Sequence, residues 1–297
     1  MTHPSNQYKN CLEPTWCKGC SYFSVMAALG DCLSFRGTDP LKVNIVSGIG
    51  CSSRLPLFLN TFGMHTLHGR ALPVAIGARL ARPDIPVMVV AGDGDLFSIG
   101  AAHFVHAARK NFNITVLCLD NRSYAMTKNQ ASPTSPVGYQ GTLTPFGKLS
   151  APLNVPEFAI ACGATHVSRC VAFDKNYTAE CIGEAFDHRG FSLVEILAPC
   201  KSFGSREPAK EILGRVSNLQ DKKHDVSDRS AAMEAASRAV DYDRIAESPI
   251  DVGLFWKTEA PVFEDQVENV QRNWKATLSL ENILDLATPE AIQKEKS

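Results

Sequence analysis

The chain has 297 residues, of which 44% are hydrophobic and 21% charged, an ordinary composition for a soluble protein of one large or two modest domains. Its formal net charge of −1 gives no reason to expect nucleic acid or an anionic membrane as partner. No apolar run approaches the roughly 18 residues of a membrane-spanning helix, and the first ten residues lack the apolar core of a signal peptide. We therefore expect a cytoplasmic protein that contacts neither nucleic acid nor membrane.

The pattern along the chain predicts three segments. Residues 1–20 are expected to form an extended arm. From about 21 to 200, helix-like and strand-like patterns alternate, which predicts an α/β fold with a doubly wound, mostly parallel sheet covered by helices on both faces. Residues 201–297 begin with a charged stretch and are expected to form a C-terminal appendage on the sheet domain or on a partner subunit, with a helix at 229–240, a strand at 250–256 and part of a last helix at 281–286.

One strand–helix–strand unit ends both of its strands in polar residues. The apolar run at 87–91 leads into Gly92-Asp93-Gly94-Asp95, and a second run at 114–119 leads into Asp120-Asn121, with a helix expected at 96–111 between them. Strands joined in this way lie parallel with a right-handed crossover. Their carboxyl ends therefore meet at one edge of the sheet, where open α/β sheets bind ligands.

The polar residues at these strand ends suit a magnesium ion. The carboxylate of Asp93, the amide oxygen of Asn121 and the backbone carbonyl of Ser123 make half of an octahedral oxygen cage, and Mg²⁺ usually completes its shell with phosphate oxygens and water. Gly92 and Gly94 would let the backbone approach a phosphate closely. The pattern predicts metal-bridged diphosphate binding, and the alternative is an ordinary Asp-Gly turn between a strand and a helix.

The chain has ten cysteines, and their positions in the sequence divide most of them into two groups. Five are expected as small buried side chains of helices and strands: Cys32, Cys118, Cys162, Cys170 (immediately before a strand at 171–173) and Cys181. Four lie in loop-like positions: Cys17 and Cys20 in a Cys-x-x-Cys pair, Cys51 after a strand at 43–47, and Cys200 after a strand at 192–197. Four such thiolates can converge on a tetrahedral site that suits zinc or an iron–sulfur cluster. A thioredoxin-like redox pair, unliganded thiols, and Cys11 as a substitute ligand are the alternatives.

Taken together, the motifs resemble those of the β subunits of 2-oxoacid:ferredoxin oxidoreductases, which bind thiamine diphosphate. The shared motifs occur in order from about residue 12 to 200, with a weaker continuation at 260–264: Trp16-Cys-Lys-Gly-Cys20, Ser47-Gly-Ile-Gly-Cys-Ser-Ser53, Leu67-His-Gly-Arg-Ala-Leu-Pro73, Gly92-Asp-Gly-Asp95, Asp120-Asn121 and Gln130-Ala-Ser-Pro-Thr134. The chain departs from the family after Asn121, because Ala125 and Asn129 stand where the family usually has glycine.

The resemblance implies three cofactors and the residues that hold them. Cys17, Cys20, Cys51 and Cys200 would bind one [4Fe–4S] cluster, and Asp93, Asn121 and the carbonyl of Ser123 would bind Mg²⁺. Thiamine diphosphate would lie close to both, and the residues expected to bind it are Ile49, Gly50, Cys51, Ser52, His68, Gly69, Gly92, Gly94, Asp95, Tyr124, Ala125, Met126 and Thr127. The Pro- and Gly-rich stretch at 123–151 is expected to be a lid over cofactor and substrate.

The resemblance also implies an activity and partners. The enzyme would reversibly convert a 2-oxoacid and coenzyme A into an acyl-CoA and CO₂, with electrons passing through the cluster to ferredoxin. An α (or fused α/γ) subunit would supply the glutamate that the aminopyrimidine of thiamine needs, in an (αβ)₂ heterotetramer. The stretch at 48–55 is most similar to the 2-oxoglutarate branch, whose product is succinyl-CoA. Pyruvate or branched 2-oxoacids, a non-redox thiamine decarboxylase or synthase subunit with structural zinc, and a non-catalytic partner-binding protein are the alternatives.

Three polar side chains are candidates for direct contact with the substrate. His68 could hydrogen-bond the substrate or a developing oxyanion, although it could also be a structural residue at the start of a helix, and His65 is a weaker alternative. Arg54 could pair with the second carboxylate of 2-oxoglutarate, although it could equally form an ordinary surface ion pair. Lys128, on the opposite loop, is the third candidate and would assist Arg54.

Overall fold

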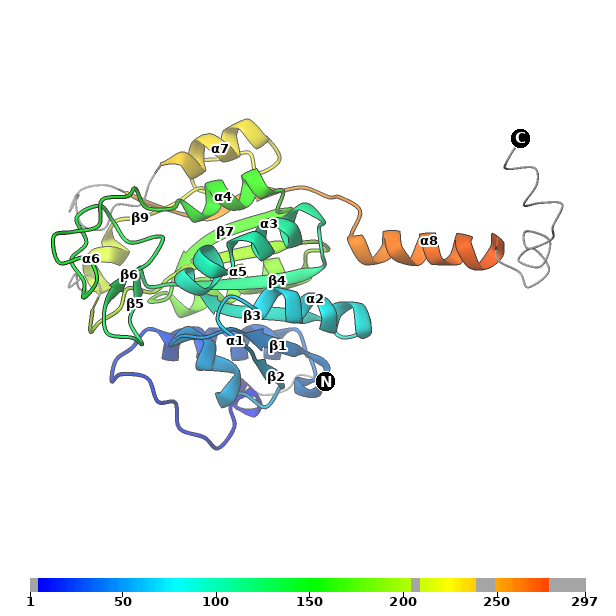
Figure 1. The fold of residues 1–297 in the computed structure, drawn as a ribbon, viewed down its shortest axis with the longest axis horizontal. Coiled ribbons are helices and arrows are strands. Elements are labelled where there is room, and N and C mark those ends of the chain that lie inside the picture. The colour runs from blue at the N-terminus through cyan, green and yellow to red at the C-terminus, as the bar shows by residue number, and fades with distance from the viewer. Residues whose placement is uncertain (1–4, 204–208, 239–248, 278–297) are drawn as a thin grey trace, which may run out of the picture.

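The computed structural model describes residues 5–203, 209–238 and 249–277, which form a main sheet of eight strands with helices on both faces (Figure 1) and a separate pair of two short strands. The strand order is β2-β1-β3-β4-β8-β7-β10-β9. The first six are all parallel: β2 (Phe62–His65), β1 (Asn44–Ser47), β3 (Val87–Gly92), β4 (Ile114–Asp120), β8 (Ser192–Leu197) and β7 (His166–Val171). The predicted doubly wound α/β fold is therefore confirmed.

Alternate residues of the central strands are buried in two separate cores. Val87, Val89 and Ala91 of β3 pack with helices α2 (Ala71–Ala81), α3 (Ala101–Arg109), α4 (Val155–Cys162) and α7 (Arg229–Ser237) on one face. Met88 and Val90 point the other way, into the core that includes α1 (Tyr22–Phe35) and α5 (Lys175–Asp187). Because both faces are covered, β3 and β4 are continuous hydrophobic runs rather than alternating ones. The polar residues that follow these strands lie at the sheet's carboxyl edge.

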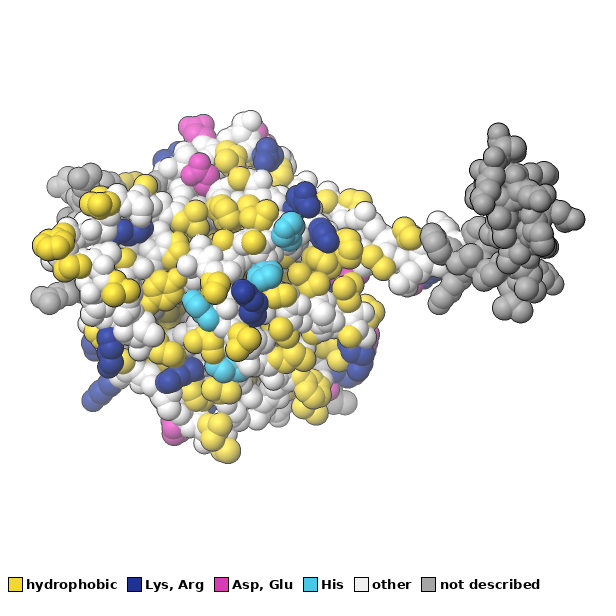
Figure 2. Space-filling model, in the orientation of Figure 1, with side chains coloured by type: hydrophobic (Ala, Val, Ile, Leu, Met, Phe, Trp, Pro, Cys, Tyr) yellow, Lys and Arg dark blue, Asp and Glu magenta, His cyan; other side chains and the backbone are white. Residues whose placement is uncertain are grey.

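The face that carries α2, α3 and α4 has many exposed apolar side chains. Figure 2 shows that hydrophobic and uncharged side chains dominate this view, with histidine and basic residues among them and few acidic ones. Leu67 and Ile99, which flank the two helices α2 and α3, are 75% and 52% exposed. Exposed apolar residues gathered on one face are typical of a surface that binds another molecule.

The segment after β3 differs from the single helix expected at 96–111. A π-helix, Asp95–Ile99, comes first, and α3 begins at Ala101. Such wide turns are rare and occur frequently at functional sites. Cys170 is also placed differently than expected, because β7 already begins at His166 and Cys170 lies inside it. It is nevertheless buried, as are Cys32, Cys118 and Cys181, whereas Cys162 is half-buried.

Two C-terminal strands extend the main sheet. β10 (Ile250–Lys257), which covers the strand expected at 250–256, is antiparallel to β7, and β9 (Val216–Asn218) pairs in parallel with β10. A short helix, α6 (Ala209–Gly214), precedes β9. The helix expected at 229–240 is found as α7, while the one at 281–286 lies outside the described residues. The division of the chain at residues 20 and 200 stays a prediction.

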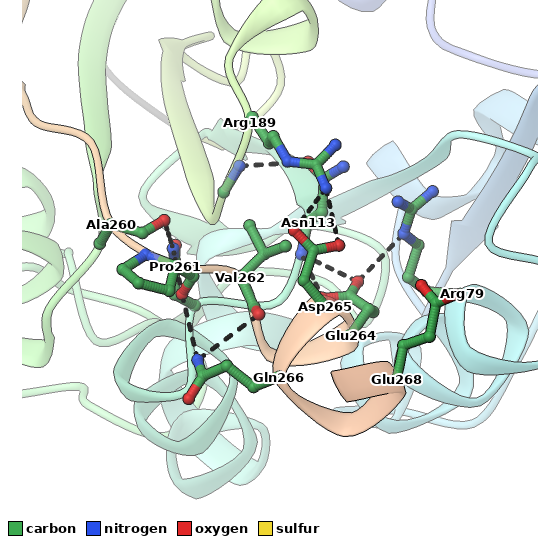
Figure 3. A network of polar contacts seen from close by, with 12 residues as sticks. Arg79, Asn113, Arg189, Ala260, Pro261, Val262, Glu264, Asp265, Gln266 and Glu268 are labelled. Carbon is green, nitrogen blue, oxygen red and sulfur yellow. Dashed lines mark hydrogen bonds and ion pairs between the residues drawn. The ribbon is translucent and has the colours of Figure 1, made fainter. Parts of the chain in front are cut away.

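Helix α8 (Phe263–Thr277), which the sequence pattern did not predict, extends away from the body of the molecule (Figure 1). Its first turn is attached by polar contacts that Figure 3 shows. Glu264 accepts hydrogen bonds from Arg79 (3.0 Å) and from the backbone N–H of Asn113 (3.1 Å), and Arg189 donates to Asp265 at 2.7 Å. None of the described helices is both long and apolar enough to cross a membrane.

Candidate functional site

A cavity of about 230 Å³ opens where the loops after β1, β3 and β4 meet. Its wall contains every residue predicted to bind thiamine diphosphate or Mg²⁺ at this edge of the sheet, with the single exception of Gly69: Ile49, Gly50, Cys51, Ser52, His68, Gly92, Asp93, Gly94, Asp95, Asn121, Ser123, Tyr124, Ala125, Met126 and Thr127. Gly69 is adjacent to His68, and its backbone N–H donates to Asp95. The cavity therefore lies at the edge of the sheet where the strand ends predicted a ligand.

Asp93 is 1% exposed and lies beside a second buried carboxylate, Asp120. The hydroxyl of Thr134 is 2.7 Å from Oδ2 of Asp93 and 2.8 Å from Oδ1 of Asp120. Burial, and then the charge of Asp120, raise the pKa of Asp93 to about 7. Two buried carboxylates with one shared hydroxyl hydrogen favour a bound cation, so the residues present fit Mg²⁺.

The turn after β4 links the two residues expected to supply the other oxygen ligands. Oδ1 of Asn121 accepts from the backbone N–H of Ser123 at 3.0 Å, and Arg122 between them has a left-handed backbone with φ of 57°. Ser123 and Tyr124 (β5) then pair with Gln130–Ala131 (β6). The motif at 130–134 was recognisable in the sequence but gave Thr134 no role, because no local pattern places a hydroxyl just beyond a short hairpin.

The glycine at position 94 makes room for an aromatic ring. A Cβ there would be 2.3 Å from the ring of Tyr124, whose hydroxyl donates to the carbonyl of Gly94. Gly94 therefore lets this ring approach the backbone, and its expected contact with a phosphate stays a prediction. Ala125, where the family has glycine, is not among the residues with positive φ, so alanine causes no strain there. Asn129 does adopt the left-handed region, with φ of 82°.

His68 is fixed by the last residue of the Gly-Asp-Gly-Asp motif. Its Nδ1 lies 2.6 Å from Oδ1 of Asp95, and its ring makes an edge contact with Tyr124. His65, the weaker alternative, lies on β2 outside the cavity wall, and its Nδ1 contacts the hydroxyl of Ser47. His68 is thus the one of these two histidines that faces the cavity.

A second cavity, of about 80 Å³, brings together the four loop cysteines. Cys17, Cys20, Cys51 and Cys200 all line it, while Cys11 is exposed and lies outside its wall. The indole of Trp16 donates to the carbonyl of Cys51 at 2.7 Å and so ties the arm to the loop after β1. Within the described residues, no three His, Cys, Asp or Glu side chains are gathered as a binding group for one metal ion. Instead, the thiols of these four cysteines line the wall of the second cavity.

Comparison with known proteins shows the family. Residues 48–196 match the family described as "Thiamine pyrophosphate enzyme, C-terminal TPP binding domain", and residues 200–272 match the C-terminal family of the pyruvate ferredoxin oxidoreductase beta chain. The chain is 36% identical over 259 residues to the 2-oxoacid:ferredoxin oxidoreductase subunit beta of a Sulfolobus species, a match that covers 85% of each chain. The chain belongs to the family of 2-oxoacid:ferredoxin oxidoreductase β subunits.

Other members of this family are similar over different lengths. The 2-oxoglutarate synthase subunit KorB of Archaeoglobus fulgidus is 34% identical, with 92% of this chain and 95% of the relative covered. The 2-oxoglutarate oxidoreductase subunit KorB of Mycobacterium tuberculosis is 44% identical, but the match spans only 64% of this chain and 51% of that relative. A solved 2-oxoglutarate:ferredoxin oxidoreductase from Magnetococcus marinus, with 2-oxoglutarate, coenzyme A and succinyl-CoA bound, superimposes with a TM-score of 0.88 at 37% identity, covering 97% of both chains.

The two basic residues predicted to recognise substrate lie apart in this family member. Arg54 lines the cysteine cavity rather than the larger one, and its Nη1 donates to the hydroxyl of Thr15 at 2.9 Å. Lys128 is exposed and belongs to neither cavity wall.

Burial raises the pKa of Cys20 to about 11 and that of Cys51 above its ordinary value, while the nearby Arg54 opposes the rise for Cys51. Metal binding would have to displace these thiol protons.

Proposed function

We propose that the chain is the thiamine-diphosphate-binding β subunit of an enzyme that converts 2-oxoglutarate and coenzyme A into succinyl-CoA and CO₂, with electrons passing through a [4Fe–4S] cluster to ferredoxin. The observation that carries this proposal is that the two cavities share a wall. Cys51, Asn121 and Ala125 line both of them. A cofactor in the larger cavity would therefore lie directly beside a cluster in the smaller one, close enough for electrons to pass between them.

Thiamine diphosphate, when bound, supplies the carbon that adds to the ketone of the 2-oxoacid and accepts the electron pair left when CO₂ departs. The residues of this chain bind and orient it. Asp93, Asn121 and the carbonyl of Ser123 would hold the Mg²⁺ of the diphosphate, and His68 would hydrogen-bond the substrate from the cavity wall.

The four cysteines suit a cluster better than a single zinc ion. Each thiolate of a [4Fe–4S] cluster binds a different iron, so its four sulfurs stand further apart than four sulfurs on one ion. The thiols here surround a cavity, and the described residues contain no three-membered group for one ion. Both observations favour the cluster over the alternative of a non-redox enzyme with structural zinc.

For the substrate, we propose 2-oxoglutarate rather than pyruvate or a branched 2-oxoacid. Several similar proteins are named 2-oxoglutarate synthase subunits, and the solved relative holds 2-oxoglutarate. Arg54, which lines the cysteine cavity together with the shared residue Cys51, is the proposed partner of the second carboxylate. Lys128 would contribute its charge from the loop after β4, without direct contact with the cavity.

A partner is needed to complete the site. Among the described residues, the wall of the larger cavity contains no glutamate that could hold the aminopyrimidine of thiamine. An α-type subunit would supply it, and the apolar face of Figure 2, with exposed residues such as Leu67 and Ile99, suits such a subunit. We extend the proposal to an (αβ)₂ heterotetramer in the cytoplasm that delivers its electrons to ferredoxin.

The test is anaerobic co-expression of the chain with an α-type subunit. Iron, sulfide and thiamine would be measured, and the absorbance spectrum recorded before and after 2-oxoglutarate plus coenzyme A. About four irons per αβ unit that are bleached by substrate, and that disappear in a Cys17→Ser variant, are expected. Zinc in place of iron, with thiamine still bound, would favour the non-redox enzyme. A protein with neither metal nor thiamine would contradict the proposal.

A further inference from the structure

One oxygen of Asp95 connects three loops of the larger cavity. Oδ1 lies 2.6 Å from Nδ1 of His68, 2.7 Å from the backbone nitrogen of Gly69 and 3.2 Å from the backbone nitrogen of Ile49. The Asp95 side chain is 2% exposed, so water competes little for these contacts. The loop after β1, the loop before α2 and the turn after β3 therefore meet at a single carboxylate.

The surroundings of the second oxygen are shaped for the carboxylate. Oδ2 is buried and has no hydrogen-bond partner among the described residues. It lies against Gly48, where a Cβ would be only 1.9 Å away. Residue 48 must therefore be glycine for Asp95 to reach the other loops. A buried oxygen with no donor is unfavourable, and a functional role is one reason why such an atom is retained.

The contacts of Oδ1 determine which nitrogen of His68 carries a proton. Two of its three partners are backbone N–H groups, which can only donate, so Oδ1 accepts from both. Two N–H donors on Oδ1 favour an ionised oxygen, which only accepts, over a hydroxyl. We therefore assign Nδ1 of His68 as the donor, and Nε2 is the ring nitrogen that remains for the cavity.

We propose that Asp95 is a positioning residue, which holds His68 in the tautomer with Nδ1 protonated and directs Nε2 toward the substrate. The inference rests on the function proposed above and specifies how His68 takes part in it. Neutral His68 then offers an acceptor at Nε2, and charged His68 offers a donor there. Asp95 stands two residues after Asp93, so one turn fixes both the expected metal ligand and the orientation of the imidazole.

The test is a double-mutant cycle in the αβ complex, with kcat, KM and the Kd for thiamine diphosphate measured for each variant. We expect Asp95→Ala and His68→Ala each to lower kcat about 100-fold, and the double variant to fall no more than about threefold below His68→Ala alone. Asp95→Asn, whose amide oxygen can still accept from Gly69 and Ile49, should lower kcat about tenfold and leave the Kd nearly unchanged. Asp84→Asn, at an exposed carboxylate paired with Arg82, is the matched control and should behave as the unaltered enzyme.

Two outcomes would overturn the inference. One is a double variant in which the two losses multiply, which would mean that Asp95 acts independently of His68. The other is an Asp95→Asn variant whose Kd for thiamine diphosphate rises as much as its kcat falls, which would make Asp95 a part of the cofactor site only. If the Asp95→Ala variant does not assemble into the αβ complex, the same double-mutant cycle with Asp95→Asn tests whether Asp95 acts through His68. An unaltered complex that binds no thiamine diphosphate contradicts the proposed function instead.

Discussion

The hydroxyl of Thr134 has one hydrogen and two carboxylate neighbours, Asp93 and Asp120. It can donate to only one of them at a time, while Asp120 also accepts from the backbone N–H of Arg122 at 2.9 Å. When it donates to Asp93 it fixes the side chain of the expected Mg²⁺ ligand, and when it donates to Asp120 it leaves Oδ2 of Asp93 more open to a cation. Thr134 is therefore placed to orient the expected Mg²⁺ ligand.

Replacing Thr134 by valine should weaken Mg²⁺-dependent binding of thiamine diphosphate about 10- to 100-fold, because partners that orient metal ligands contribute on that order. Titration calorimetry of the αβ complex at fixed Mg²⁺ would measure the Kd. Thr134→Ser keeps the hydroxyl and should bind within about threefold of the unaltered complex. Equal affinities for the valine and serine variants would contradict this role.

Replacing Arg54 by leucine should raise the KM for 2-oxoglutarate about tenfold or more and leave that for 2-oxobutyrate nearly unchanged, since only the former has a second carboxylate to lose its charged hydrogen bond. Steady-state kinetics of the complex with both substrates would show the difference. Thr15→Ala removes the hydroxyl that holds Arg54 but keeps the charge, and should have a smaller effect. An equal rise in KM for both substrates would contradict a role of Arg54 in recognising the second carboxylate.

At the scale of elements, strands with a buried apolar interior could be predicted from the sequence. Strands that are exposed or partly polar could not. The strands β1, β3, β4 and β8 were found because each has a buried apolar interior. β2 was missed because all four of its residues are exposed at the sheet edge, so no apolar pattern marks it. β7 was predicted too late because His166, Ser168 and Arg169 are polar. The buried Arg169 is neutralised by Glu195 on β8, at 2.6 Å, which no local pattern reveals.

Helix α8 depends on one largely buried ion pair, between Glu264 and Arg79. Glu264→Ala should destabilise the protein by about 3–5 kcal/mol, because it leaves the buried guanidinium of Arg79 without its carboxylate partner and the N–H of Asn113 without its acceptor. Urea unfolding and the rate of proteolytic removal of α8 would measure this loss. Arg189→Ala, which breaks the exposed pair with Asp265, is the control and should cost less than about 1 kcal/mol. Similar losses of stability in both variants would contradict the special importance of the Glu264–Arg79 pair.

At the scale of the whole molecule, a histidine buried in the sheet links stability to pH. Burial, then the neighbouring His188 and Lys257, lower the pKa of His166 to about 3. The unfolded chain takes up this proton near pH 6.5, whereas the folded chain resists it until about pH 3. The stability that this group contributes is therefore fully present above about pH 6.5 and falls between these values, by about 1.4 kcal/mol per pH unit.

His166→Phe should flatten this dependence, because phenylalanine takes up no proton in either state. The urea concentration at the unfolding midpoint, measured at about pH 7, 6 and 5, should fall less steeply for the variant than for the unaltered protein. His106→Ala, at an exposed position of α3, should keep the original slope. An unchanged slope in His166→Phe would show that other groups cause the acid sensitivity.

The residues of the site could be predicted from the sequence more readily than the contacts between their side chains. Parallel strands bring their carboxyl ends to one edge, so motifs after β1, β3 and β4 could be assigned to one cavity from the sequence. Contacts between side chains of those motifs, such as Asp95 with His68 or Tyr124 with Gly94, could not. They depend on the exact length and direction of each turn, and Arg54 shows the limit, since it lines the neighbouring cavity.

The order of the strands also has a consequence for how the protein is made. β4 and β8 are neighbours in the sheet, although β7, a short hairpin and two helices separate them in the chain. On the ribosome, the turns that bear Asp93 and Asn121 emerge early, and so do Cys17, Cys20 and Cys51. Cys200 follows shortly after β8, so the fourth thiol arrives only when the centre of the sheet can close. We therefore expect biogenesis to be ordered, with insertion of the proposed cluster waiting until the parallel sheet is complete.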